Sequence, residues 1–142
     1  FMVDVKVMDD GQHRELTGVS NRQVLENLRR LDRQGKPSIV RTPLIAGLND
    51  RPEQIASIAD WLAELSGVRQ YELLPYHPLG TGKYEALGLA GPPEDYCSPS
   101  REHLRDLVAR ASRPNLVVKA AGVPQASANH DEDRPRNPAS SR

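Results

Sequence analysis

Three stretches of the chain have the hydrophobic pattern of β-strands. Phe1 to Met8 alternates strictly, with its three valines on one side and Met2, Asp4 and Lys6 on the other. Pro37 to Ile45 is rich in branched aliphatic residues. The third stretch starts at Val68 and stops at Pro75, because proline cannot donate to a strand ladder.

Amphipathic stretches with helical spacing separate these strands. The first predicted helix is capped by Ser20 or Asn21 and runs to about Gln34. The second runs to about Leu65 and starts with a capping box formed by Asp50 and Glu53. The order strand, helix, strand, helix, strand makes two successive βαβ units, so the pattern predicts an α/β fold with a parallel sheet. Residues 9–21 are expected to be a polar connection in which His13 is a loop residue.

The remainder of the chain is less regular. A long loop is expected from Gly80 to Ser98, followed by a helix that begins between Ser98 and Ser100 and ends near Ala111. Leu116 to Lys119 has the composition of a short last strand. From residue 122 onward small, polar and charged residues dominate, which predicts a disordered tail. The chain is therefore divided into a folded unit, residues 1–121, and a tail, residues 122–142.

Composition narrows the class of protein. The formal net charge is zero over 142 residues, which gives no electrostatic reason to expect nucleic acid or an anionic membrane as a partner. No apolar run approaches the ~18 residues of a membrane helix, and no signal peptide is visible, so the cytoplasm is the expected location. Phe1 already lies inside a predicted strand, from which we expect that this chain has lost the front half of its domain.

Charged side chains lie in or after each of the three strands. Asp4 and Lys6 belong to the first strand, Arg41 to the second, and His77 follows the third on a loop stiffened by Pro75 and Pro78. Ligands of parallel α/β proteins bind at the carboxyl edge of the strands, so these residues form a candidate site. Lysine and arginine recognise carboxylate or phosphate, and an aspartate accepts hydrogen bonds from an amine or hydroxyl, which suits a zwitterion or a nucleoside-like ligand.

Simpler interpretations stay open for each of these residues. The pattern of Phe1 to Met8 is also typical of an ordinary strand with one solvent-exposed face. Asp4 could equally form an internal ion pair with Lys6 or Arg41. His77 could equally be a residue of a rigid turn that has no functional role. Packing within the loop explains Tyr76 and Tyr84 as well as contact with a partner does. Cys97 is interpreted as incidental, and His103 as an exposed residue in the first turn of the last helix.

Four motifs follow one another along the chain: Met-Val-Asp-Val-Lys at 2–6, His-Arg-Glu-Leu-Thr-Gly-Val-Ser-Asn at 13–21, Val-Arg-Thr-Pro-Leu-Ile-Ala-Gly at 40–47 and Leu-Leu-Pro-Tyr-His-Pro-Leu-Gly at 73–80. In order and in register, they resemble the motifs of the glycyl-radical enzyme activating enzymes, the radical S-adenosylmethionine (SAM) group typified by pyruvate formate-lyase activase. Lys83-Tyr84-Glu85 followed by Leu87-Gly88 extends the match, which covers residues 1–120.

The resemblance implies a partial (β/α)6 barrel of which this chain supplies the C-terminal half. It also implies that Asp4, Lys6, Arg41 and His77 line the SAM site, and that Met2 and Asp4 help to hold a monovalent cation beside SAM. The loop from His77 to Tyr84 would lie near the rim where the partner's glycine-bearing segment enters, and five residues within this loop or directly before it are candidates for binding the partner. These are Tyr76, Leu79, Gly80, Lys83 and Tyr84.

The activity implied for the intact parent is hydrogen abstraction from a backbone glycine of a partner glycyl-radical enzyme by a 5′-deoxyadenosyl radical, with a reductant such as flavodoxin or ferredoxin. The three cysteines that bind the family's [4Fe-4S] cluster have no counterpart, since Cys97 stands alone. We therefore expect the isolated chain to be inactive. Two other readings remain: a truncated half-barrel with no catalytic role, or half of another barrel enzyme whose rim binds a phosphate.

Overall fold

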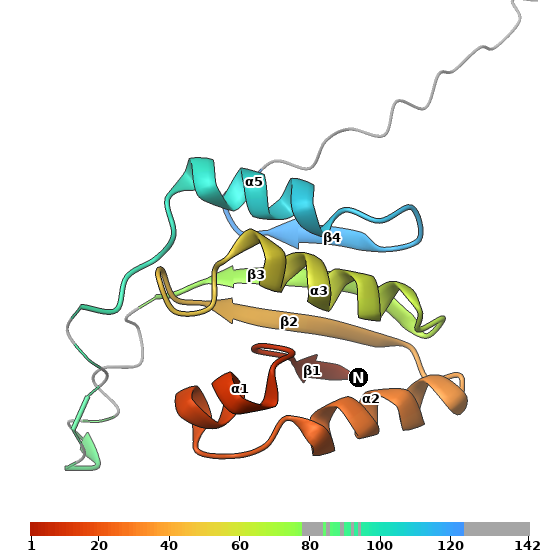
Figure 1. Ribbon diagram of the computed structural model, residues 1–142, viewed down its shortest axis with the longest axis horizontal. Coiled ribbons are helices and arrows are strands. Elements are labelled where there is room, and N and C mark those ends of the chain that lie inside the picture. The colour runs from red at the N-terminus through yellow and green to blue at the C-terminus, as the bar shows by residue number, and fades with distance from the viewer. Residues whose placement is uncertain (78–83, 85, 89, 92, 94, 124–142) are drawn as a thin grey trace, which may run out of the picture.

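The computed structural model describes residues 1–77, 84, 86–88, 90, 91, 93 and 95–123 (Figure 1). Part of the predicted loop between Gly80 and Ser98 and nearly all of the predicted tail from residue 122 lie outside these residues. Three of the candidate partner-binding residues, Leu79, Gly80 and Lys83, lie outside them as well.

Strands and helices alternate along the described chain. The strands are β1 (Met2–Asp4), β2 (Ser38–Leu44), β3 (Val68–Pro75) and β4 (Val117–Ala120). The helices are α1 (Asp10–Thr17), α2 (Arg22–Arg33), α3 (Pro52–Ala63) and α5 (Arg101–Ala111). The strands form one sheet in the order β1-β2-β3-β4, and every neighbouring pair is parallel. The predicted α/β fold with parallel strands and helical crossovers is confirmed, with the predicted last strand as the fourth member of the sheet.

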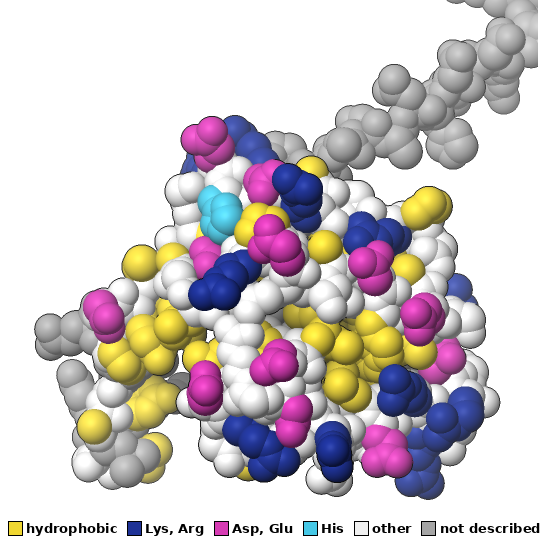
Figure 2. Space-filling view, in the orientation of Figure 1, with side chains coloured by type: hydrophobic (Ala, Val, Ile, Leu, Met, Phe, Trp, Pro, Cys, Tyr) yellow, Lys and Arg dark blue, Asp and Glu magenta, His cyan; other side chains and the backbone are white. Residues whose placement is uncertain are grey.

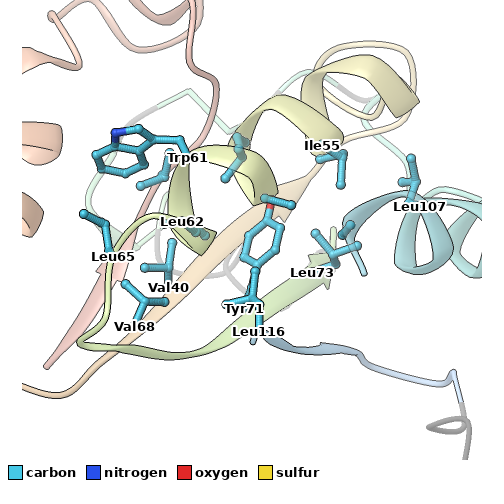
Figure 3. Close-up of a cluster of buried hydrophobic side chains, with 14 of the residues drawn as sticks. Val40, Ile55, Trp61, Leu62, Leu65, Val68, Tyr71, Leu73, Leu107 and Leu116 are labelled. Atoms are coloured by element: carbon cyan, nitrogen blue, oxygen red, sulfur yellow. The ribbon is translucent and has the colours of Figure 1, made fainter. Parts of the chain in front are cut away.

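The core lies between one face of the sheet and the helices. Val40, Leu44, Tyr71 and Leu73 alternate along β2 and β3 and are fully buried. In Figure 3 Tyr71 points from β3 toward α3, whose Ile55 and Leu62 lie over the sheet. The residues between them on the strands, such as Arg41 and Glu72, are only half-buried. The sheet therefore has one face covered by helices and one face that retains access to solvent.

Residues 9–21 do not form the expected polar connection but contain helix α1. Asp9 caps this helix by accepting a hydrogen bond from the Gln12 amide at 2.7 Å, and Gly18 ends it with a left-handed conformation, φ 77°. His13 is buried on this helix instead of lying in a loop, and its Nδ1 donates to the Val19 carbonyl oxygen at 2.7 Å. The prediction failed because an eight-residue, mostly polar helix shows almost no hydrophobic periodicity.

The predicted capping box of the second helix is also wrong. Arg51 occupies the N-cap position of α3 and makes no side-chain capping bond. Asp50 instead accepts a hydrogen bond from the Gly47 amide at 2.8 Å, and its carboxylate lies 3.2 Å from Nε2 of His103 on α5. His103 is consequently half-buried, not exposed as predicted. A contact with a residue 53 positions away decides the role of Asp50, and the local sequence pattern does not reveal such contacts.

Asp10 binds three donors at the start of α1. Its carboxylate accepts from the Ser20 hydroxyl at 2.5 Å, the Asn21 amide at 3.1 Å and Arg14 Nε at 2.9 Å. The Ser20 hydrogen bond, followed by that of Arg14, lowers the pKa of Asp10 to about 2. A carboxyl group whose pKa is lower in the folded than in the unfolded chain stabilises the fold above its ordinary pKa and loses that contribution as the pH falls.

We therefore expect the melting temperature to fall between about pH 4 and pH 2 by more in the wild type than in an Asp10→Asn variant. Thermal melts followed by circular dichroism across this range measure the difference. Asp106→Asn is the control, because Asp106 sits in an exposed pair with Arg110 at 3.7 Å. Identical pH dependence in the wild type and Asp10→Asn would contradict the role of Asp10.

The outer surface of the helices is ordinary protein surface. Figure 2 shows basic and acidic side chains intermingled over it. The arginines of α2 are exposed, and one of them, Arg29, lies over the Trp61 ring at 5.5 Å from its centroid. In the part of the chain that the structure describes, no helix is long and apolar enough to cross a membrane.

Candidate functional site

Asp4 and Arg41 meet on the face of the sheet opposite the helices. They are register partners on β1 and β2, and Arg41 donates from Nε (3.1 Å) and from a terminal nitrogen (3.0 Å) to the same oxygen, Oδ1 of Asp4. Each side chain is about one-third exposed. Oδ2 of Asp4 has no hydrogen-bond partner among the described residues, so it can still accept from an amine or a hydroxyl. The pair is charged, paired and accessible to a ligand.

The charge pattern continues across the whole sheet. Arg41 is in register with Glu72 on β3, and Glu72 with Lys119 on β4. The row Asp4, Arg41, Glu72, Lys119 therefore alternates in sign over four strands. We call it the charge row. Glu72 also accepts a hydrogen bond from Gln70 Nε2 on its own strand.

Sequence reasoning missed Glu72 and Lys119 as members of this face. The signal was present for Glu72, because it lies between the buried Tyr71 and Leu73 and must point to the other side. For Lys119 the register of β4 was needed, and four residues are too few to fix a register from pattern.

Lys6 follows two residues after Asp4, beyond the paired part of the strand. Phe1 to Met8 was predicted as one strand, but β1 covers only Met2–Asp4, and the backbone ladder to β2 ends with the Val5 amide donating to the Arg41 carbonyl at 2.9 Å. Lys6 is half-buried. It lines a groove of about 710 Å³ together with Asp4 and with residues of α2, among them Asn27 and Leu31.

His77 is exposed and lies just past the end of β3. The backbone between β3 and His77 is held by the Tyr76 amide, which donates to the Leu44 carbonyl oxygen at 2.8 Å. Since Arg41 is level with Glu72, His77 stands five residues, or ~16 Å, farther along the strands. Within the described residues, no hydrogen bond or ion pair joins it to the Asp4–Arg41 pair. The structure thus brings Asp4 and Arg41 into contact and places His77 at the carboxyl edge, apart from them.

The other candidate residues are less organised. Tyr76 packs edge-on against Tyr96, with ring centroids 6.0 Å apart, and Tyr84 is 40% exposed. Met2, proposed beside a cation, is 56% exposed. The described residues contain no group of three or more His, Cys, Asp or Glu placed to hold a metal ion, and Cys97 is exposed.

Two solved structures are similar in fold to this chain. A domain of pyruvate-formate lyase-activating enzyme from Bacteroides vulgatus matches 85% of this chain and 66% of its own, with a TM-score of 0.67 and 27% identity. A radical SAM methyltransferase from Sphaerobacter thermophilus matches 84% of this chain with a TM-score of 0.58, at 21% identity. The chain has the fold of a radical SAM enzyme domain.

Similarity in sequence to curated proteins gives a more specific class of protein than the fold does. The chain is 50% identical over 93 residues to isethionate sulfite-lyase activating enzyme of Nitratidesulfovibrio vulgaris, covering 64% of this chain and 30% of that protein. It is 34% identical over 105 residues to pyruvate formate-lyase-activating enzyme of Streptococcus mutans, covering 74% of this chain and 40% of that one. No protein-family model matches the chain.

In sequence and in fold the chain is thus similar to glycyl-radical enzyme activating enzymes, which confirms the resemblance predicted from its motifs. It spans 30% of the length of the first of these two relatives and 40% of the length of the second.

Proposed function

We propose that this chain is the SAM-binding part of an activating enzyme that generates a glycyl radical on a partner enzyme. The observation that carries the proposal is the Asp4–Arg41 pair on the accessible face of the sheet, with the Lys6 backbone continuing from it, in a chain whose relatives are named activating enzymes. The activity itself is proposed for the intact protein, since the chain spans less than half of those relatives.

The residues on this face suit SAM. Asp4 offers a free carboxylate oxygen for the ribose hydroxyls or the amino group, and Arg41 retains guanidinium nitrogen atoms for the carboxylate. Lys6 adds a second cation next to Asp4, and His77 adds an imidazole at the carboxyl edge. When bound, SAM is the source of the 5′-deoxyadenosyl group that abstracts hydrogen from the partner's glycine. The task of this chain is to hold and orient that molecule.

The residues present do not suit the [4Fe-4S] cluster that the family uses. The sequence has one cysteine, Cys97, and a cluster of this type needs several thiolates. We propose that this chain alone does not cleave SAM. For the intact protein we propose a glycyl-radical enzyme as partner, flavodoxin or ferredoxin as reductant, and a cytoplasmic location. Tyr76 and Tyr84, with Leu79, Gly80 and Lys83 outside the described residues, are proposed to face the partner.

Isothermal titration of the full chain tests the binding proposal. SAM and S-adenosylhomocysteine are expected to bind, and a sugar phosphate to bind at least tenfold more weakly, a difference of about 1.4 kcal/mol. Preference for the sugar phosphate would favour the alternative of a phosphate-binding barrel. Absence of any SAM binding by a chain shown to be folded by circular dichroism would overturn the proposal.

Anaerobic reconstitution with iron and sulfide tests the inactivity of the isolated chain. We expect neither the visible absorption of a cluster nor the release of 5′-deoxyadenosine from SAM after reduction, because the thiolate ligands are too few. Both signals together in the purified chain would refute this part of the proposal and leave the binding result unaffected.

A further inference from the structure

The backbone that carries Lys6 is buried but lies beyond the strand ladder. Val5 and Val7 are 0% and 1% exposed, and Lys6 and Met8 are half-buried. The last ladder bond in this region is the one from the Val5 amide to Arg41. Buried carbonyl groups without partners are costly, so the carbonyls from Val5 to Met8 need donors from elsewhere.

Side chains supply donors to all four successive carbonyl oxygens. The Thr42 hydroxyl donates to Val5 at 2.5 Å. Nδ2 of Asn49 donates to Lys6 at 3.3 Å, and Nδ2 of Asn21 donates to Val7 at 3.2 Å and to Met8 at 2.6 Å. The segment is therefore held by side chains from β2, from the loop after β2 and from the residue before α2.

Asn49 is itself rigidly placed at the carboxyl end of β2. It is 5% exposed, its Oδ1 accepts from the Ile45 amide at 2.9 Å, and its Nδ2 also donates to the Pro43 carbonyl at 2.8 Å. The two hydrogens of one amide group thus bind the end of β2 and the backbone of Lys6. Asn21 is 2% exposed, and its backbone amide donates to the Asp10 carboxylate.

We propose that Asn49 and Asn21 are positioning residues that fix the Lys6 backbone in the orientation that ligand binding requires. This inference rests on the proposed SAM site and names two residues that act on it without touching the ligand. A backbone that is already ordered does not lose conformational entropy when Lys6 binds its ligand, so the affinity is higher than with a mobile segment. Neither asparagine caps a helix with its side chain; for Asn21 the side chain is directed to Val7 and Met8 instead.

The first measurement requires no ligand. Amide ¹⁵N relaxation of the full chain is expected to give rigid order parameters for Lys6 and Val7, near 0.85, and values below about 0.6 in Asn49→Ala. The order parameters of β3 and β4 are expected to stay unchanged. If Lys6 and Val7 remain as ordered in the variant as in the wild type, the positioning role is overturned, whatever the SAM result is.

The second measurement is SAM affinity. We expect Asn49→Ala to weaken SAM binding about tenfold, and Asn21→Ser, the second variant should Asn49→Ala not fold, to do so in the same direction. Two controls separate positioning from general stability. Asn115→Ala removes the same kind of bond, from Nδ2 to the Ala63 carbonyl at 2.8 Å, away from β1. Leu107→Ala lowers stability through the core on α5, a helix that packs mainly against α3 and β4.

Both controls are expected to keep wild-type SAM affinity at a temperature where they are folded. If Leu107→Ala weakens SAM binding as much as Asn49→Ala at equal loss of melting temperature, the effect is one of stability and the inference is overturned. If the wild type binds no SAM, the proposed function fails by itself, and the order parameters still decide whether Asn49 and Asn21 fix this segment.

Discussion

Replacing Thr42 by valine is expected to lower the free energy of unfolding by about 2–4 kcal/mol, although the two side chains have nearly the same shape. The Thr42 hydroxyl donates to the Val5 carbonyl at 2.5 Å and lies 2.9 Å from the Tyr71 hydroxyl. Since its hydrogen goes to Val5, Tyr71 must donate to Thr42. One buried chain of hydrogen bonds thereby joins β3, β2 and the residue that follows β1, and burial raises the pKa of the Tyr71 hydroxyl.

Urea denaturation measures the change in the free energy of unfolding, and two further variants test whether the hydrogen bonds cause it. Thr42→Ser keeps both hydrogen bonds and is expected to cost about 1 kcal/mol, for the missing methyl group. Tyr71→Phe removes one of the two groups that Thr42→Val leaves without a partner, so the double variant should be less destabilised than the sum of the single variants. Additive effects would show that the two hydroxyls do not act as one network.

Replacing Arg41 by leucine is expected to weaken SAM binding by a factor of about 10–100, the largest effect on binding that we predict. The variant loses the group proposed to bind the carboxylate of SAM and also frees Asp4 from its partner, so two contacts of the proposed site change together. Arg41→Lys keeps the charge but not the two-nitrogen geometry and should lie between the wild type and the leucine variant.

Arg113→Leu is the matched control for this titration. It breaks another arginine–aspartate pair, with Asp60 on α3 at 2.7 Å, which lies on the helical side of the molecule. We expect unchanged SAM affinity. Equal affinity of Arg41→Leu and wild type would remove Arg41 from the proposed site and favour the interpretation of an ion pair that serves only the fold.

The fold was predictable wherever burial imposed a period on the sequence. Val40, Leu44, Ile55, Ile58 and Leu62 face one core, and their spacing correctly gave β2 and α3. Prediction failed where polar contacts decide the structure. Helix α1 is stabilised by its caps and buries only His13, and Asp50 binds Gly47 and His103 instead of capping α3.

The candidate site was predictable in part for the same reason. Alternation along β1 placed Asp4 opposite the valines, and the parallel order of the strands brought it next to Arg41. The ion-pair partner of Asp4 was not predictable, because the sequence pattern is equally compatible with a pair to Lys6 and a pair to Arg41. Only the register shows that Arg41, and not Lys6, is the partner. The positions of Asn21 and Asn49 depend on contacts between segments 14 and 43 residues apart.

The alternating signs of the charge row have a consequence for any molecule that carries both a positive and a negative group. Neighbouring strands are ~4.8 Å apart, so such a molecule lying across them meets an opposite charge at each end in one direction. Turned end for end in the same place, it meets like charges, and it recovers the match only by moving one strand sideways. On this sheet the direction of a bound zwitterion and its location are therefore not independent choices.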